Sequence, residues 1–226
     1  LWDVVLDGAA TASSDNLAAV SVASDGDVLI TGRVEAAGLE GADQMLTARY
    51  DSDGNELWTD LHDENASLFD GGTYIEADGN GNAFVVGTVD SGNLERHDIR
   101  YALYDQNGNV TWEHKYDGPV TGDCESQSIV CDAGNDGAIL ADGNFAVAGA
   151  VHAVKPDRGA FIGIFNASGS LLWERLVEGE EDFRDSMTSV AQGPDGSLYV
   201  GGFLVRDNGM EGQHNDFFLA KYTPSY

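Results

Sequence analysis

Residues 24–32 read Ser-Asp-Gly-Asp-Val-Leu-Ile-Thr-Gly, and residues 49–58 read Arg-Tyr-Asp-Ser-Asp-Gly-Asn-Glu-Leu-Trp. Each segment places an apolar run beside a turn rich in aspartate and glycine. Glycine accepts the positive φ that tight hairpin turns require, so both segments are typical of β-hairpins. Both patterns recur along the chain, and a recurring pattern of this kind predicts a repeat fold.

Three markers recur with one phase and a spacing of 53 to 62 residues. The first is a pair of glycines six residues apart that enclose an apolar run: Gly26/Gly32, Gly81/Gly87, Gly143/Gly149 and Gly196/Gly202. The second is an aromatic residue four positions before a turn glycine: Tyr50/Gly54, Tyr104/Gly108 and Phe165/Gly169, with Tyr222 in the same place near the end. The third is a tryptophan four positions after that glycine: Trp58, Trp112 and Trp173, with Trp2 as the fourth of the kind. Three markers in one phase predict four equivalent structural units.

Each unit is expected to contain four short strands, typified by residues 17–23, 28–34, 44–50 and 56–61. The second strand is apolar at nearly every position, which indicates burial on both faces. No segment keeps a 3.6-residue apolar period long enough to predict a helix. Antiparallel four-stranded sheets repeated at this length are typical of β-propeller blades, so the fold class is all-β, a propeller. The four tryptophans then occupy one strand position and are expected to pack between blades.

The expected blades are approximately residues 15–61, 70–116, 132–176 and 185–222, within one domain over residues 1–226. The chain opens with a fourth-type strand at residues 1–7 and finishes with a third-type strand at residues 216–222. If these two strands pair, the N-terminal strand closes the last blade and leaves no exposed sheet edge. Two alternatives stay open: a piece of a larger propeller with further blades, or a half-ring that forms a homo-oligomer.

The marker residues resemble the bacterial seven-bladed β-propeller repeat family (SBBP type). In that family an Asp-Gly turn, an apolar strand and a glycine are followed by an aromatic residue, a turn glycine and a tryptophan. The resemblance extends over nearly the whole chain and implies a propeller fold, but no particular activity. The present chain has four repeats where the family has seven.

The links between strands differ in length on only one side of the expected sheets. Links from first to second and from third to fourth strands are short everywhere. The other links vary, and the longest spans residues 116–132. Binding residues concentrate on variable loops that are mounted on a rigid scaffold, so we expect this side to bind a partner. Three histidines also fall in these links: His97, His152 and His214.

An aspartate stands eleven residues before the first glycine of each pair: Asp15, Asp70, Asp132 and Asp185. In a propeller these four carboxylates would surround the mouth of the central channel, where they would repel one another unless compensated. One hypothesis is a Ca²⁺ or Mg²⁺ site, since both ions take oxygen ligands. The alternative is that each carboxylate accepts backbone N–H groups and locks adjacent blades together.

Two cysteines, Cys124 and Cys131, lie close together in the longest link. In an oxidising compartment they would form a disulfide, and in a reducing one they would remain thiols. Together with the acidic composition and the scarcity of lysine, this pair favours an extracellular, cell-surface or periplasmic location.

The chain carries 39 acidic and 11 basic residues, a formal net charge of -28. A field of that sign repels nucleic acid and anionic lipid. No apolar run approaches the roughly 20 residues of a membrane helix, so no membrane insertion is expected. We therefore expect a protein or a glycan as partner.

No nucleophile elbow, phosphate-binding loop or zinc-protease motif is present in the sequence. The sequence therefore predicts no enzyme, but a non-catalytic binding or scaffold module. One alternative is a hydrolase or lyase acting on glycans through acidic residues of the loop-rich side. Another is a structural building block of a larger assembly, which exposed apolar patches would indicate.

Overall fold

A computed structural model describes residues 1–6, 15–36, 42–64, 70–90, 97–119, 132–152, 158–179, 184–207 and 213–226. Over these residues the chain forms fifteen β-strands and no helix, so the predicted all-β class is confirmed. None of the described residues belongs to a helix that could cross a membrane.

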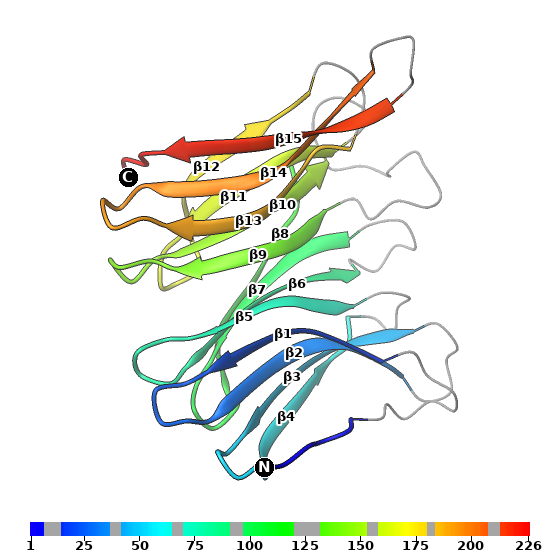
Figure 1. Ribbon diagram of the computed structural model, residues 1–226, viewed down its shortest axis with the longest axis vertical. Helices are drawn as coiled ribbons and strands as arrows, with labels where there is room; N and C mark the ends of the chain where they lie inside the picture. Colours follow the sequence, from blue (N-terminus) through cyan, green and yellow to red (C-terminus); the bar gives the residue numbers. More distant parts are fainter. Residues whose placement is uncertain are drawn as a thin grey trace. The chain divides into compact units, whose positions relative to one another are not determined.

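The strands form four antiparallel sheets, each in simple up-and-down order (Figure 1). Sheet A contains β1 (Asn16–Val22), β2 (Val28–Glu35), β3 (Asp43–Tyr50) and β4 (Glu56–His62). Sheet B contains β5 (Gly71–Ala77), β6 (Ala83–Asp90), β7 (His97–Tyr104) and β8 (Val110–Tyr116). Sheet C contains β9 (Ala133–Ile139), β10 (Phe145–His152), β11 (Arg158–Phe165) and β12 (Leu171–Val177). Sheet D contains β13 (Ser186–Gln192), β14 (Leu198–Asp207) and β15 (Gln213–Tyr222).

The strands of the first repeat agree with the sequence-based bounds to within one residue. The last sheet differs from the expectation, because sheet D has three strands and residues 1–6 are not in a strand. Sheets A, B and C thus have the four expected strands, and sheet D has three strands of its own. Closure of sheet D by residues 1–6 stays a prediction, because these residues belong to the other of the two compact units of the chain.

Seven five-residue turns join the first to the second and the third to the fourth strands: residues 23–27, 51–55, 78–82, 105–109, 140–144, 166–170 and 193–197. In each turn the fourth residue is a glycine with φ between 77° and 94°. Its N–H donates to the carbonyl oxygen of the first residue of the turn over 2.8 to 3.1 Å. A side chain at this φ would be strained, which explains why glycine recurs at this position.

The second glycine of each pair has a different role. Gly32 of β2 lies beside the bulge that β1 makes between Leu17 and Ala19, close to the carbonyl group of Asn16. A Cβ atom at Gly32 would collide with that carbonyl oxygen. Gly87, Gly149 and Gly202 face the first strands of their own sheets in the same way. Close approach of two backbones is thus the reason for the six-residue glycine spacing.

The chain divides into two compact units. The first comprises Leu1–Leu94 and Arg100–Lys115, with sheet A and most of sheet B. The second comprises Glu95–Ile99 and Tyr116–Tyr226, with sheets C and D. The single ring that would join all four sheets stays a prediction.

Each unit has its own apolar core between two sheets. In the first unit, Leu29 and Met45 of sheet A pack with Ile75, Ala83 and Val85 of sheet B. In the second unit, Ala146, Ala148 and Ile162 of sheet C form a core with Val190 and Val200 of sheet D. Within each unit, one face of the earlier sheet therefore packs against one face of the later sheet.

Candidate functional site

The four predicted aspartates stand directly before the first strand of each sheet, at the base of the variable links. The Oδ1 atom of each accepts a backbone N–H from the residue twenty positions later. The donors are Glu35 to Asp15 over 3.0 Å, Asp90 to Asp70 over 2.7 Å, His152 to Asp132 over 2.6 Å and Val205 to Asp185 over 2.8 Å. Each carboxylate thus holds the end of the second strand of its own sheet.

The second oxygen of three of these aspartates accepts a backbone N–H from the preceding link. Glu64 donates to Asp70 and Gly118 to Asp132, each over 2.6 Å, and Gly179 donates to Asp185. These donors follow the fourth strand of the preceding repeat. The carboxylate therefore ties the link to the strand end, as the backbone-locking alternative predicts.

The backbone of the same aspartates completes the connection. The N–H of Asp70 donates to Asp43, that of Asp132 to His97 and that of Asp185 to Arg158, over 3.0 to 3.2 Å. Each acceptor is the first residue of a third strand in the preceding repeat. We name this arrangement of Asp15, Asp70, Asp132 and Asp185 the aspartate anchors. They fix both ends of the variable links to the rigid sheets.

Burial raises the pKa of two of the aspartate anchors. Asp70 and Asp132 are 0% and 1% exposed. Desolvation raises the pKa of Asp70 to about 6, although two backbone hydrogen bonds oppose the shift. Desolvation likewise raises the pKa of Asp132 to about 7, with a further contribution from the charges of Asp117 and Asp98.

One of the four predicted metal ligands, Asp132, lies in a group of carboxylates, and the metal site itself stays a prediction. Over the described residues, the group of candidate ligands with atoms within 4.8 Å of one another consists of Asp98, Asp117 and Asp132. It contains one of the four anchors, and its other members come from the start of β7 and the link after β8. Three carboxylate oxygens are suitable ligands for Ca²⁺. The sequence did not indicate Asp98 or Asp117, because neither belongs to a repeated marker.

Other predicted site residues lie elsewhere. Cys124 and Cys131 fall outside the described residues. The three histidines expected in links lie in strands, because β7 begins at His97, β10 ends at His152 and β15 includes His214.

The tryptophans of β4 and β12 each contact an aromatic residue of the next sheet, and Trp2 repeats the hydrogen bond that Trp58 makes. Trp58 stacks on Tyr104 of the next sheet, and Trp173 lies 5.7 Å from Tyr222 of the next sheet, centroid to centroid. Trp2 donates its indole N–H to Ser52 over 2.9 Å, as Trp58 donates to Gln106 over 3.1 Å. Trp112 contacts Phe84 and Tyr101 of its own sheet, with centroids 6.2 Å apart in both pairs. Trp58, Trp112 and Trp173 are half-buried, since an outer strand is covered on one side only, and Trp2 is exposed.

A buried arginine was not indicated by the sequence reasoning. Arg100 is 1% exposed and donates to Tyr104 over 3.0 Å and to Glu113 over 2.8 Å. The hydroxyl of Tyr104 in turn donates to Asp60 of sheet A over 2.6 Å. Alignment of the repeats would have shown the anomaly, because this position holds the apolar residues Leu46, Phe161 and Phe218 in the other three.

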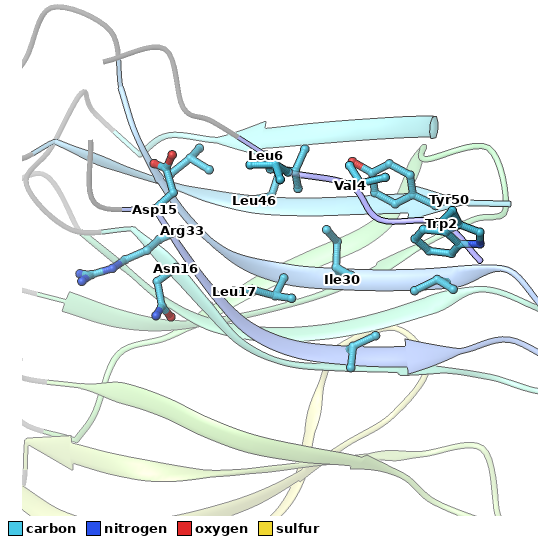
Figure 2. A pocket seen from close by; sticks show the side chains of 14 residues that line it. Trp2, Val4, Leu6, Asp15, Asn16, Leu17, Ile30, Arg33, Leu46 and Tyr50 are labelled. Atoms are coloured by element: carbon cyan, nitrogen blue, oxygen red, sulfur yellow. The ribbon is translucent and has the colours of Figure 1, made fainter. Parts of the chain in front are cut away.

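A groove of about 520 Å³ lies on sheet A beside residues 1–6. Figure 2 shows Trp2 and Tyr50 toward one end of the groove and Asp15, Asn16 and Arg33 toward the other. The lining between these ends is aliphatic: Val4, Val5, Leu6, Leu17, Val20, Val28, Ile30, Val34 and Leu46. The groove thus offers an apolar surface with polar groups at one end.

No protein-family model matches the chain, and no curated protein matches it in sequence. Among solved structures, the chain is similar to the tail fiber of Staphylococcus aureus phage P68, with 8% sequence identity and a TM-score of 0.30. The similarity covers 90% of this chain and 49% of the tail-fiber chain, so the chain spans about half the length of that protein.

Proposed function

We propose that the four sheets are blades of a β-propeller and that the chain is a non-catalytic binding and scaffold module. In this proposal the module belongs to an exported or cell-surface protein and presents its variable links to a protein or a glycan. The repeated up-and-down sheets support the propeller arrangement, and so do the markers that resemble the bacterial propeller repeat. A ring of such blades is complete when residues 1–6 serve as the fourth strand of a three-stranded sheet like sheet D.

The observation that carries this proposal is the difference between the two sides of each sheet. On one side, all seven turns have five residues and the same backbone hydrogen bonds. On the other side, the links range in length from five residues (153–157) to sixteen (117–132). The aspartate anchors accept hydrogen bonds from the backbone where these links meet the strands. Variable loops on fixed bases are the usual arrangement of a binding surface.

Charge narrows the class of partner. The net charge of -28 disfavours nucleic acid and anionic membranes. A protein with a basic patch, or a neutral glycan that hydrogen-bonds to carboxylates, fits this surface better.

The test compares the two sides of the sheets. Residues 120–130 are replaced by a short Gly-Ser linker in one variant, and the turn at residues 105–109 is replaced by Asp-Gly-Asn-Gly-Asn, the turn at residues 78–82, in a matched control. Binding is measured on a glycan array and against immobilised basic proteins. Loss of binding in the link variant alone is expected, and equal loss in both variants would contradict the proposal. Release of reducing ends from a polysaccharide panel would instead establish the glycan-active enzyme.

A second candidate function has a specific observation in its favour. Large apolar side chains are exposed on sheets A and D, among them Val20, Val22, Phe217 and Leu219. Such patches on a protein surface mark interaction sites. They favour the role of a building block in a larger assembly.

A further inference from the structure

Two Asn-x-Ser/Thr sequences lie in turns on the side of the sheets opposite the variable links. Asn-Val-Thr at residues 109–111 overlaps the end of the turn at residues 105–109, and Asn-Ala-Ser at residues 166–168 begins the turn at residues 166–170. This pattern is the acceptor sequence of N-linked glycans in exported proteins. A third such sequence, at residues 65–67, lies outside the described residues. The hydrogen bonds of the two described turns give the two asparagines different roles.

The turn at residues 166–170 is built around the side-chain oxygen of Asn166. Its Oδ1 atom accepts the backbone N–H of Ser168 over 3.0 Å and that of Ser170 over 2.9 Å. A backbone N–H can only donate, so the amide oxygen must face the turn and the amide nitrogen must face away from it. Among the described residues, none accepts a hydrogen bond from the Nδ2 atom of Asn166. The fold therefore leaves this nitrogen available for chemistry.

The serine of the acceptor sequence contacts the same amide. The hydroxyl of Ser168 donates to the Oδ1 atom of Asn166 over 2.7 Å. Three hydrogen bonds thus converge on one oxygen, and they polarise the amide toward that oxygen. The protons on the Nδ2 atom become easier to lose, which is what bond formation at this nitrogen requires.

The amide of Asn109 is arranged in the opposite way. Its Nδ2 atom donates to the Oδ2 atom of Asp105 over 2.9 Å, and its backbone N–H donates to the Oδ1 atom of the same carboxylate over 2.9 Å. The hydroxyl residue of this sequence, Thr111, belongs to β8. A glycan on Asn109 would have to break the charge-assisted hydrogen bond between its nitrogen and Asp105.

The other repeats show that the turn at residues 166–170 does not need an asparagine in its first position. The equivalent turns of sheets A and B begin with an aspartate, Asp51 and Asp105. Each aspartate accepts the same two backbone N–H groups through its Oδ1 atom, over 2.8 to 2.9 Å. Asn166 thus reproduces the turn with its oxygen and adds a nitrogen that the turn does not use.

We propose that Asn166 is an acceptor for an N-linked glycan. The donor is an oligosaccharide joined to a polyisoprenyl lipid through a phosphate or pyrophosphate group, and an oligosaccharyltransferase carries out the transfer. The Nδ2 atom forms a bond to the anomeric carbon of the first sugar, and the bond from that carbon to the phosphate oxygen breaks. The lipid phosphate leaves with the electron pair of the broken bond, and one proton passes from Nδ2 to a base of the transferase.

The inference rests on the proposed function, because N-linked glycans belong to exported proteins. It adds a position for the glycan. The turn at residues 166–170 joins β11 to β12 on the side of the short turns, and Ala167, Ser168 and Ser170 are exposed there. A glycan on this side leaves the variable links free to bind a partner.

The first test is transfer in vitro to the folded, purified full chain. Every chain carries Asn65→Gln, so a gain in mass refers to the two described sequences. The chain is incubated with a single-subunit oligosaccharyltransferase and a lipid-linked oligosaccharide, and mass spectrometry of its peptides locates the glycan. Free peptides of residues 105–113 and 162–170 are the control, because they report the preference of the transferase for either sequence without the fold.

Relative to the free peptides, the folded chain is expected to favour Asn166 over Asn109 by roughly tenfold or more, the factor that one charge-assisted hydrogen bond represents. A folded chain without a glycan at Asn166 would overturn the proposal. Equal preference in the folded chain and in the peptides would overturn it as well, since the hydrogen bonds of the turns would then be irrelevant.

The second test uses variants that separate the acceptor from the turn. Asn166→Asp keeps the oxygen that the turn uses and removes the nitrogen, so it is expected to abolish the glycan and to leave the melting temperature unchanged. Ser168→Thr keeps the hydroxyl and should retain transfer, whereas Ser168→Ala should lose it. If the Asn166→Asp chain gains the same mass as its parent, the glycan lies elsewhere and the proposal is wrong.

The outcomes also separate the glycan site from the proposed function. Absence of transfer to a chain that still binds a partner through its variable links would refute the glycan site alone. Transfer to Asn166 in a chain that binds no partner would refute the binding module and leave the acceptor site in place. Circular dichroism of every variant confirms that its sheets are intact.

Discussion

The indole ring of Trp58 in β4 stacks on the phenol ring of Tyr104 in β7, with centroids 5.6 Å apart and planes at 14°. The tryptophan comes from sheet A and the tyrosine from sheet B, so the contact joins two repeats across 46 residues of chain. The backbone of Gly108 lies beneath the same indole ring, and no side chain other than hydrogen fits there. The tyrosine, glycine and tryptophan markers in the sequence thus describe one contact between neighbouring sheets.

Gly108→Ala is expected to lower the free energy of unfolding by about 2 kcal/mol or more. The new Cβ would lie 2.8 Å from the Trp58 ring, and the residue has a φ of +81°. Two controls separate these causes. Gly143→Ala has a φ of +83° with no atom near its Cβ, so it should cost about 1–2 kcal/mol. Gly79→Ala has neither problem and should leave stability unchanged. Urea unfolding measures the stability of all three variants. Equal losses of unfolding free energy in Gly108→Ala and Gly143→Ala would exclude the contact with Trp58 as a cause.

Asp185→Ala is expected to destabilise the second unit by about 2–4 kcal/mol, because it leaves two backbone N–H groups without their acceptor. The donors are Val205 and Gly179. Asp53→Ala is the control, since Asp53 is exposed in a turn. Thermal unfolding gives the comparison, and equal melting temperatures for the two variants would show that the anchors are not structural.

Excess Ca²⁺ is expected to leave the melting temperature of the wild-type chain unchanged relative to a chelator. Both carboxylate oxygens of Asp70, Asp132 and Asp185 already accept backbone hydrogen bonds. If Ca²⁺ raises the melting temperature and Asp117→Asn abolishes that rise, the ion would instead be assigned to the group of Asp98, Asp117 and Asp132. Mg²⁺ in parallel separates a specific ion from general screening of charge.

Stability is expected to increase as the pH falls from 8 to 5. The pKa values of Asp70 and Asp132 in the folded chain are about 6 and about 7, above the 3.8 of an unfolded aspartate. The folded state therefore binds more protons in this range, and the gain in unfolding free energy reaches at most about 1.4 kcal/mol for each unit of pKa difference. Asp132→Asn is expected to flatten the dependence between pH 5 and 7. Urea titrations at each pH provide the measurement. A wild-type chain that loses stability as the pH falls from 8 to 5 would contradict the prediction.

Arg100→Leu is expected to change the free energy of unfolding by less than about 1.5 kcal/mol, whereas Arg100→Ala should cost about 2–4 kcal/mol. Leucine restores the apolar residue found at the same repeat position in sheet A, as Leu46. Glu113, the ion-pair partner of Arg100, is about half exposed, so water can solvate its carboxylate when Arg100 is replaced. If Arg100→Leu proves as harmful as Arg100→Ala, the ion pair itself stabilises the contact between the sheets.

The spacing of Gly26 and Gly32 in sequence was sufficient to predict β1, β2 and the turn between them. Both constraints are local: a positive φ at Gly26, and a close approach of backbones at Gly32. The pairing of β1 with β2 follows from them, and the ends of both strands agree with the expected bounds to within one residue. The position of the aspartate anchors was also visible, but not their partners, which lie twenty residues later and in the link before them.

The contacts of Arg100 could not be predicted in this way. Its partners include Met45, 55 residues away, and a hydroxyl that is itself held by Asp60 of another sheet. The repeat pattern shows that a charged residue is unusual at this position, but it does not show which side chains balance its buried charge. The sequence likewise did not distinguish Val20 from its buried counterparts Ile75 and Val190 in the other sheets, because all three are apolar residues at one repeat position.

The amino-acid sequence by itself determined the strands, the turns and the fourfold repetition, since each depends on backbone conformations and side chains within a few residues of one another. Only the tertiary structure decided which face of each sheet is covered and which carboxylate accepts which amide. It also decided that the sheet nearest the C-terminus has three strands. These features depend on contacts between residues far apart in the chain, whose free energy no local pattern of residues records.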